Sequence, residues 1–122
     1  RNLTYLGELP IEEVNRQLAA SHIFVNTSRA EGFPNTFIQA WMRKVPVVSL
    51  EVNPDDVLTS EEYGYCGQTY ENLRNKLLEL ADNRELRERM GEAGRQHALD
   101  VHSPKTVERL IAIMDDAPGR QR

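Results

Sequence analysis

The stretch that decides the fold is IFVNTSRAEGFPNTFIQAWMRKVPVVSL, residues 23–50 of the 122-residue chain. It opens with an apolar, β-prone run at residues 23–25 and closes with a second one at 45–50. Between them, a polar loop at 26–33 leads into a segment of helical periodicity that starts at Pro34. Near-continuous apolar strands are typical of a parallel sheet that is covered on both faces. The stretch therefore predicts a strand–helix–strand unit with a right-handed crossover.

The alternation of strand and helix continues outward from this unit. Residues 3–6 form a short β-prone run that Gly7 closes, and residues 63–66 predict a further short strand. Because this alternation is typical of parallel sheets, we expect a Rossmann-like α/β fold of three to four strands, with helices on both faces and a helical C-terminus. The expected helix starts lie near Ile11, Pro34, Tyr70, Arg84 and Pro104.

Length and composition fit one globular domain, which we place at residues 1–117, followed by a polar tail at 118–122. The net charge is −4, and the arginines of residues 84–95 alternate with glutamates, so no concentrated basic surface for nucleic acid is expected. No apolar run approaches the roughly 20 residues that a membrane-spanning helix needs. The single cysteine, Cys66, excludes a disulfide within the chain and is expected to be a buried, inert thiol.

The loop that follows residues 23–25 is the candidate site. In open parallel sheets, ligands bind where strands end and helices begin. With Pro34 as the first helical residue, Asn35 and Thr36 present backbone N–H groups that have no partner inside the helix. Together with the positive end of the helix dipole, these amides form an anion site that suits a diphosphate.

Three neighbouring residues extend this candidate site. Gly32 lets a ligand approach the backbone without a Cβ in the way, and Glu31 can aim its carboxylate at the same space. Gln39 lies on the same helix face as Asn35 and can bond a vicinal diol such as a ribose. The residues alone leave a simpler interpretation open, in which Glu31 and Asn35 cap an ordinary helix behind a turn. The loop matches neither a phosphate loop that ends in Lys-Ser or Lys-Thr nor the G-x-G-x-x-G fingerprint.

The quoted stretch resembles a known family. The run from Glu31 to Trp41, followed by Val45-Pro46-Val47-Val48-Ser49, is similar to the E-x7-E region of the family-four retaining glycosyltransferases. Residues 2–7, 19–28 and 84–95 resemble, in the same order, that family's strand before the nucleobase loop, its next helix–strand unit and its closing helices. The resemblance covers nearly the whole chain, and it implies the C-terminal, donor-binding half of a GT-B fold.

The resemblance also implies a role for each site residue. Glu31 corresponds to the Glu that lies by the donor sugar, and the backbone that follows corresponds to the part that binds sugar and diphosphate: Gly32, Phe33, Pro34, Asn35 and Thr36. Gln39 stands where the family has a second Glu that holds the ribose hydroxyls, and a neutral amide can still bond them. The loop that contacts the base corresponds to Gly7, Glu8 and Leu9. The implied substrate is a nucleotide-diphosphate sugar, with no metal and no other cofactor.

Parts of such an enzyme are absent from this sequence. In the family, basic residues on an earlier segment bind the donor phosphates, and an N-terminal domain of the same chain holds the acceptor, be it a sugar, a lipid-linked sugar or a polysaccharide. We therefore expect this fragment alone to be inactive and the parent enzyme to be cytoplasmic, with peripheral association at the inner membrane left open. Two strands that would lie between residues 3–6 and 23–25 are also missing. We accordingly expect a rearranged sheet or edge-to-edge pairing between chains.

Two other functions remain open at this point. A nucleotide-sugar epimerase can share the GT-B fold, but it requires acid–base residues at the cleft, of which this half shows only Glu31. A non-catalytic α/β interaction module, such as a receiver-type domain, requires acidic residues at strand ends. Here the run at residues 23–25 is followed by Asn26-Thr27-Ser28, which counts against that alternative.

The remaining conspicuous side chains have structural interpretations. The histidines His22, His97 and His102 show no metal-ligand spacing, so we expect them in packing or at the surface. Asp55-Asp56 follows Pro54 and is expected in a turn, which leaves little reason to propose a magnesium site there. The aromatic pair one helical turn apart, Phe37 and Trp41, is expected in the core.

Overall fold

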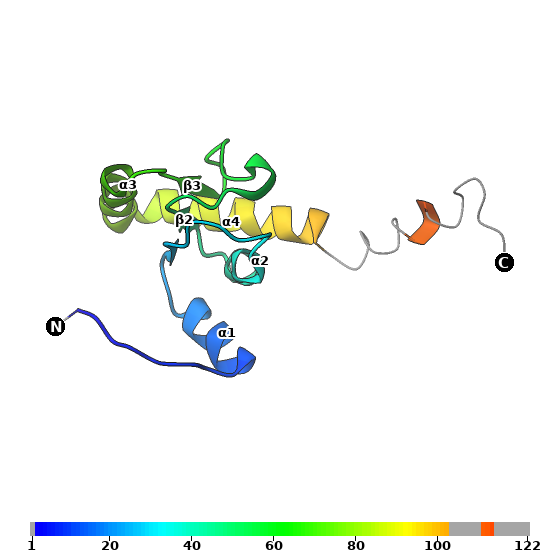
Figure 1. Ribbon diagram of the computed structural model, residues 1–122, viewed down its shortest axis with the longest axis horizontal. Coiled ribbons are helices and arrows are strands. Elements are labelled where there is room, and N and C mark those ends of the chain that lie inside the picture. Colours follow the sequence, from blue (N-terminus) through cyan, green and yellow to red (C-terminus); the bar gives the residue numbers. More distant parts are fainter. Residues whose placement is uncertain (1, 103–110, 114–122) are drawn as a thin grey trace.

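The computed structural model describes residues 2–102 and 111–113. In this part of the chain, the sheet consists of three parallel strands in the order β1 (Phe24–Asn26), β2 (Val47–Ser49) and β3 (Gly64–Cys66). The helical elements are α1 (Ile11–Ala19), α2 (Asn35–Met42), the short 3-10 turn η1 (Pro54–Asp56), α3 (Tyr70–Asp82) and α4 (Arg84–Val101). The predicted α/β class and its parallel sheet are confirmed (Figure 1).

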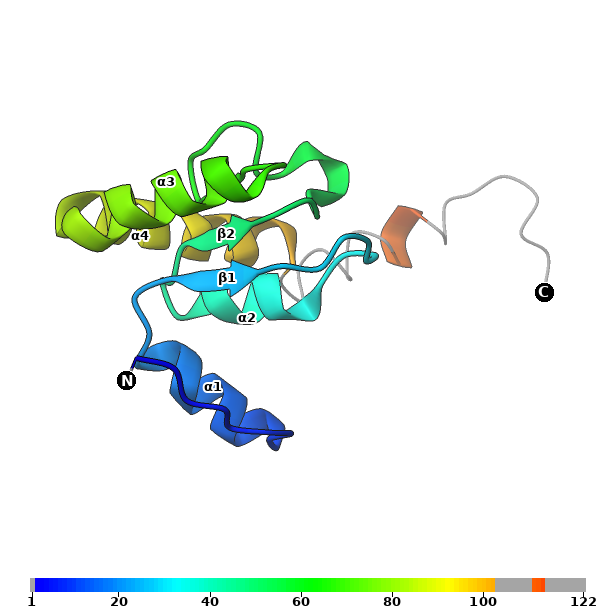
Figure 2. The same ribbon diagram turned by 60° about the vertical axis from the view of Figure 1, so that its left-hand side comes forward.

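Hydrophobic residues cover the two faces of the sheet because side chains along a strand point alternately to either side. Val47 belongs to a cluster that α1, α2 and the end of α4 complete, with Phe37 and Trp41 fully buried at its centre. Val48 belongs to a second cluster, with α3 and the beginning of α4. Figure 2 shows α2 below the sheet and α3 above it, so helices lie on both faces as the sequence predicted.

Helix caps explain two of the boundaries. The Thr69 side chain accepts a hydrogen bond from the backbone N–H of Asn72 at 3.1 Å and so starts α3. The Asn83 side chain accepts one from the backbone N–H of Leu86 at 3.0 Å and separates α3 from α4. Such caps satisfy amides that would otherwise have no partner in the first turn. The expected helix starts near Ile11, Tyr70 and Arg84 are thus confirmed.

Two of the sequence predictions are wrong, and a third concerns residues that the structure does not describe. Residues 3–6 form no strand: Leu3 and Tyr5 are 88% and 93% exposed. A strand is stable only when its N–H and C=O groups pair with a neighbour, and β1 pairs only with β2, so the sheet forms without this segment. Pro34 is the cap before α2 and not its first residue, because its ψ of 124° is extended. The helix expected near Pro104 starts outside the described residues.

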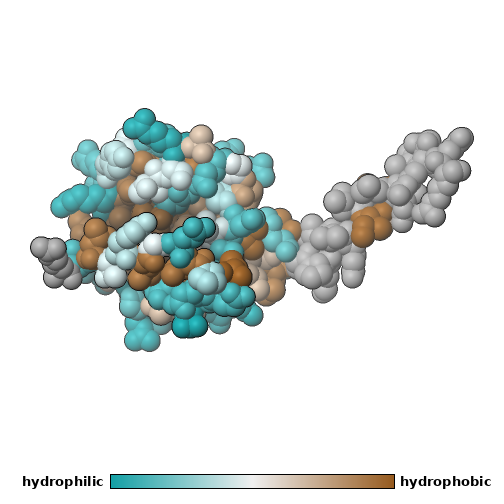
Figure 3. Space-filling model, turned by 60° about the horizontal axis from the view of Figure 1, so that its bottom comes forward, coloured by the Kyte–Doolittle hydropathy of each residue, from teal (hydrophilic) through white to brown (hydrophobic). Residues whose placement is uncertain are grey.

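The face formed by the N-terminal segment and α1 exposes hydrophobic side chains. Leu6 and Ile11 are each half-exposed, and Val25 on the edge strand β1 is also partly exposed. Figure 3 shows hydrophobic atoms interspersed with hydrophilic ones on the side of the molecule turned forward there. Whether this edge pairs with another chain, as the sequence analysis suggested, stays a prediction.

An aromatic cluster joins α2, α4 and the segment before β3. The indole N–H of Trp41 donates a hydrogen bond to the backbone oxygen of Tyr63 at 3.0 Å. The His97 ring stacks on the Tyr63 ring, with ring centroids 4.4 Å apart. It meets the Trp41 ring edge-on at a centroid distance of 5.2 Å, and its centroid lies 5.7 Å from that of His102. Burial lowers the pKa of both histidines. For His97 the neighbouring His102 lowers the pKa further, whereas Asp100 and Glu62 oppose this effect.

We expect Gly94→Ala to lower the free energy of unfolding by about 1–3 kcal/mol, the usual cost of overpacking a core. A Cβ at Gly94 would lie 2.5 Å from Trp41 Cδ1, and the indole is fixed by its hydrogen bond. Urea unfolding measures the change. The control Gly32→Ala adds a Cβ with no atom within 4 Å, so its stability should stay close to that of the wild type. An unchanged unfolding midpoint for Gly94→Ala would contradict this account of helix packing.

We expect the chain to lose stability as the pH falls from about 7.5 to about 5.5, in part through the two histidines. Their folded pKa values lie below the unfolded value of about 6.5, so their contribution is complete above that pH and is lost as the pH falls through the lowered values. His97→Phe keeps a flat ring against Tyr63 and should make the urea midpoint less dependent on pH. Gln17→Ala, an exposed position without a titratable side chain, serves as the control and should leave the pH dependence unchanged. An equal pH dependence of the urea midpoint in the wild type and in His97→Phe would contradict this explanation.

Candidate functional site

The candidate site lies where β1 ends and α2 begins. β1 ends at Asn26, and the connecting loop reaches the cap Pro34 before the helix starts at Asn35. The carboxyl ends of parallel strands and the amino ends of the helices that follow them meet at the same edge of the sheet, which is where ligands bind in such folds. Figure 2 shows this edge, with the loop after β1 turning back into α2.

A carboxylate is held in place at this edge. The Asn26 side chain donates a hydrogen bond from Nδ2 to Glu31 Oε2 at 3.0 Å. Its other atom, Oδ1, accepts a hydrogen bond from the backbone N–H of Ser28 at 2.9 Å, which folds the loop into a turn. Asn26 is 8% exposed, whereas Glu31 is exposed. A buried amide at the end of the strand thus holds an exposed carboxylate in one orientation.

The amino end of α2 has no side-chain cap. Its cap residue is Pro34, which is buried and makes no capping hydrogen bond, and its carbonyl accepts from the backbone N–H of Phe37 at 3.1 Å. Amides in the first turn of a helix have no partner further back in the helix, so those of Asn35 and Thr36 depend on solvent or a ligand. Asn35 is exposed and Thr36 is half-buried. The anion site that the sequence predicted at this helix end is therefore not filled by a side-chain cap, and its role stays a prediction.

Gly32 has no role in the fold that requires glycine. A Cβ at this position would meet no atom within 4 Å, and its φ lies outside the left-handed region. The space above the loop is therefore open. A side chain there would project into that space, and the predicted role of Gly32 beside a ligand stays a prediction.

Phe33 faces the interior, unlike its neighbours in the loop. Its ring centroid lies 6.4 Å from that of Phe37, 6.2 Å from that of Trp41 and 5.0 Å from that of His102. It can therefore meet a ligand mainly through its backbone, and its side chain fastens the loop to the aromatic cluster.

The other two predicted parts of the site lie apart from the loop. Gln39 is half-buried on α2, four residues after Asn35 and so on the same helix face. Gly7, at a bend with φ of 70°, and Glu8 are exposed, and Leu9 is half-buried just before α1. In Figure 2 the beginning of α1 lies toward the same side of the view as the carboxyl end of β1. The roles of these residues stay predictions.

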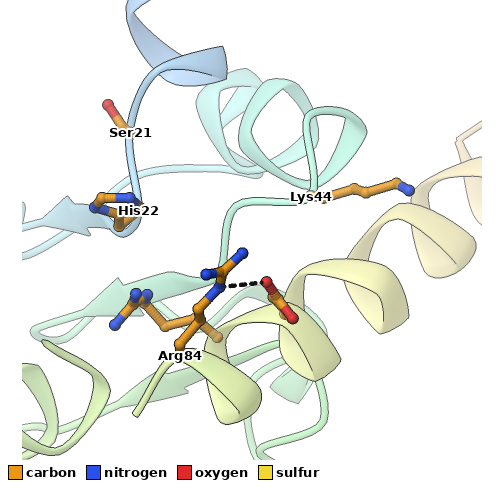
Figure 4. A pocket seen from close by; sticks show the side chains of 6 residues that line it. Ser21, His22, Lys44 and Arg84 are labelled. Carbon is orange, nitrogen blue, oxygen red and sulfur yellow. Dashed lines mark hydrogen bonds and ion pairs between the residues drawn. The ribbon is translucent and has the colours of Figure 1, made fainter. Parts of the chain in front are cut away.

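Two cavities differ in their relation to this edge. One of about 410 Å³ touches the loop through Phe33, and it also has the carboxylates Asp55, Asp56 and Glu62 in its lining. One of about 480 Å³ lies at the opposite end of the strands, lined by Ser21, His22, Lys44, Arg84, Arg87 and Glu88 (Figure 4). Larger size does not make the second the better donor site, because it lies away from the carboxyl ends of the strands.

The basic side chains around the 480 Å³ cavity already have partners. Arg84 pairs with Glu88 at 2.8 Å, the ion pair dashed in Figure 4, and Lys44 pairs with Glu92 at 2.9 Å. Arg87 donates hydrogen bonds to the carbonyl groups of Leu80 and Ala81 at the end of α3. Because Arg84, Lys44 and Arg87 already bond groups of the protein, these contacts fit a helix face with paired charges better than an anion site.

Other reactive groups point to no second chemistry. The Cys66 thiol donates a hydrogen bond to the Leu50 carbonyl at 3.6 Å, and burial raises the pKa of this half-buried thiol, which favours its protonated, unreactive form. Asp55 and Asp56 lie in the 3-10 turn after Pro54, as the sequence predicted. Within residues 2–102 and 111–113, no group of three or more His, Cys, Asp or Glu has an arrangement that could hold a metal ion.

None of the described helices combines the length and the apolar character that a membrane-spanning helix requires.

Asn26 was not predicted as a site residue from the sequence. Its signal was a polar residue at the end of an otherwise apolar run, followed two residues later by Ser28. Asparagine in such a position commonly bonds the backbone two residues on. What the sequence did not reveal is that the same side chain would reach Glu31, five residues away.

Comparison with known proteins shows the family of this chain. Residues 1–97 match the model of the family described as glycosyl transferases group 1. One relative comes from Corynebacterium glutamicum and is named GDP-mannose-dependent monoacylated alpha-(1-6)-phosphatidylinositol monomannoside mannosyltransferase. It is 29% identical over an alignment of 128 residues that covers 97% of this chain and 34% of the relative. The chain thus spans about a third of the length of that curated relative. No solved structure matches this chain. Because the family model covers most of its length, the chain belongs to the group 1 glycosyltransferases.

Proposed function

We propose that this chain binds the nucleotide-diphosphate sugar donor of a glycosyltransferase that transfers the sugar with retention of configuration. The observation that carries the proposal is the uncapped amino end of α2 directly after a fixed carboxylate, Glu31. A diphosphate needs N–H donors and a positive dipole, and a sugar needs acceptors for its hydroxyls. One loop–helix unit supplies both at the carboxyl edge of the sheet.

Each part of the loop has a proposed role toward the donor. The diphosphate lies against the amides of Asn35 and Thr36, with the backbone of Gly32, Phe33 and Pro34 passing close to the sugar and its phosphate. The carboxamide of Gln39 bonds the ribose hydroxyls, and the loop of Gly7, Glu8 and Leu9 contacts the base. Family membership and the exposure of this loop support these assignments.

Charge development at the leaving group explains how these residues would contribute to catalysis. As the bond from the sugar to the diphosphate breaks, negative charge grows on the diphosphate and the sugar ring becomes positive. Preorganised amide dipoles stabilise charge where it develops, without reorganisation during the step. Glu31 orients a sugar hydroxyl and favours the positive ring, and it is not the nucleophile. The helix amides take the role that a cation has in other transferases, so the proposal includes no metal cofactor.

The acceptor lies outside the proposed site. We propose that a part of the full-length protein not represented in this chain, corresponding to an N-terminal domain, holds it, and that catalysis takes place in the cytoplasm. The relative, of which this chain covers 34%, leaves room for such a domain. The donor in the relative's name, GDP-mannose, makes that compound the first donor to test.

We expect a titration of this chain with GDP-mannose and other nucleotide-diphosphate sugars, followed by NMR, to shift the amide signals of Gly32, Asn35 and Thr36. Gln39→Ala should raise the dissociation constant about tenfold, because it removes one ribose contact. In the full-length protein the same variant should raise the donor KM with little change in kcat, the sign of lost uniform binding.

The matched control for this titration is Gln17→Ala, at an exposed position on α1. It should bind the donor as the wild type does. Signal changes confined to residues around Lys44 and Arg84 would move the donor site to the opposite edge of the sheet and overturn the proposal.

We expect Glu31→Ala in the full-length protein to lower kcat by roughly 10²-fold or more, the scale of one lost electrostatic contribution in an active site. Steady-state release of nucleoside diphosphate measures it, and analysis of the sugar product separates transfer from epimerisation. Glu85→Ala, an exposed glutamate at the start of α4, is the control and should keep wild-type kcat. A nearly normal kcat in Glu31→Ala would remove Glu31 from the catalytic assignment.

A further inference from the structure

We infer that Asn26 is a positioning residue for the transfer reaction, because its side chain sets the orientation of the Glu31 carboxylate. The inference rests on the proposed function of Glu31 and goes beyond it by adding a residue that does not itself touch the donor. Two hydrogen bonds of the Asn26 side chain support the inference. Its Nδ2 donates to Glu31 Oε2 at 3.0 Å, and its Oδ1 accepts from the backbone N–H of Ser28 at 2.9 Å.

Asn26 is itself fixed by the sheet. Its carbonyl accepts a hydrogen bond from the backbone N–H of Leu50 at 2.8 Å, and its Cα is in register with Ser49 of β2. The residue is 8% exposed, so its side chain has little freedom. The orientation of the Glu31 carboxylate therefore derives from the rigid strand and not from the exposed loop. Catalytic groups held by locked neighbours keep their geometry better than groups on free loops.

The chemistry of the contact requires an amide. Asn26 gives one donor to a carboxylate and one acceptor to a backbone amide at the same time, which an aspartate cannot do. Aspartate has nearly the same shape and retains the acceptor for Ser28, but it places a second negative charge against Glu31. Asn26→Asp is thus a selective change. The hydrogen bond from the Ser28 backbone can persist, whereas the hydrogen bond to Glu31 is replaced by repulsion between two carboxylates.

The amide also leaves part of the carboxylate free for a substrate. One oxygen of Glu31, Oε2, accepts from Asn26, and Oε1 has no recorded partner among the described residues. A carboxylate with one oxygen held by the protein and one open can accept a hydrogen bond from a sugar hydroxyl without losing its orientation. Asn26 thereby orients the carboxylate so that one of its two equivalent oxygens is left for the ligand.

The test compares Asn26→Asp with Asn83→Asp in the full-length protein, with release of nucleoside diphosphate from GDP-mannose as the readout. Asn83 also accepts a backbone N–H through Oδ1, at 3.0 Å, but it caps α4 at the other edge of the sheet. We expect Asn26→Asp to lower kcat by roughly 10–10²-fold with a smaller change in donor KM, the cost of a misplaced catalytic group. The acid limb of its pH–rate profile should also move to higher pH, because two adjacent carboxyl groups resist losing both protons. Asn83→Asp should keep the wild-type kcat and pH profile.

The double variant Asn26→Asp with Glu31→Gln separates this inference from the proposed function. In that pair the donor and acceptor are exchanged, so the hydrogen bond can form again with its direction reversed. If Asn26 acts through Glu31, the double variant is no slower than Glu31→Gln alone. If the loss of kcat in the double variant equals the product of the losses in the two single variants, Asn26 acts independently of Glu31 and the inference is overturned. Normal turnover in Glu31→Gln would refute the proposed role of Glu31 instead, and kcat and pH profile unchanged in Asn26→Asp would refute the positioning role alone.

Discussion

The indole of Trp41 is the contact on which the rest of the structure depends. It is fully buried on α2, its N–H is bonded to the backbone before β3, and its ring lies against Gly94 on α4. Three segments that are distant in sequence therefore meet at one side chain. A buried Trp N–H without an acceptor would cost free energy, so the Tyr63 carbonyl fixes both the rotamer of the indole and the position of the strand that follows.

The same cluster also determines where the site can be. Phe33 packs its ring against Trp41 and His102, which anchors this end of the loop to the core. Asn26 anchors the loop at its other end, through the strand. The loop between them is short, and both of its ends are held by buried groups. A segment with exposed residues can thus present a defined surface to a ligand without forming a helix or strand of its own.

Some features of the fold followed from sequence pattern, and others depended on contacts that no pattern reveals. The apolar run at residues 45–50, which contains Val47-Val48-Ser49, is buried on both faces, and its continuous apolar character is why it could be recognised as a strand of a parallel sheet. Residues 3–6 have equally β-prone composition but no neighbour to pair with, and strand formation is decided by pairing and not by the residues alone. In the candidate site, the loop position and the proline at the start of the helix predicted an anion site, which stays a prediction. The reach of Asn26 to Glu31 depends on how the loop folds back, which is tertiary information.

Gly32 shows that stability and ligand fit are decoupled at one position of this loop. Its backbone dihedrals are available to any residue, and the space beside it is empty of protein atoms. Replacements of Gly32 would therefore leave the fold intact, and any effect they have would be on ligand binding. In evolutionary terms, the position is one at which the side chain can change while the scaffold stays intact. Gly94, whose missing side chain is required by Trp41, offers no such latitude.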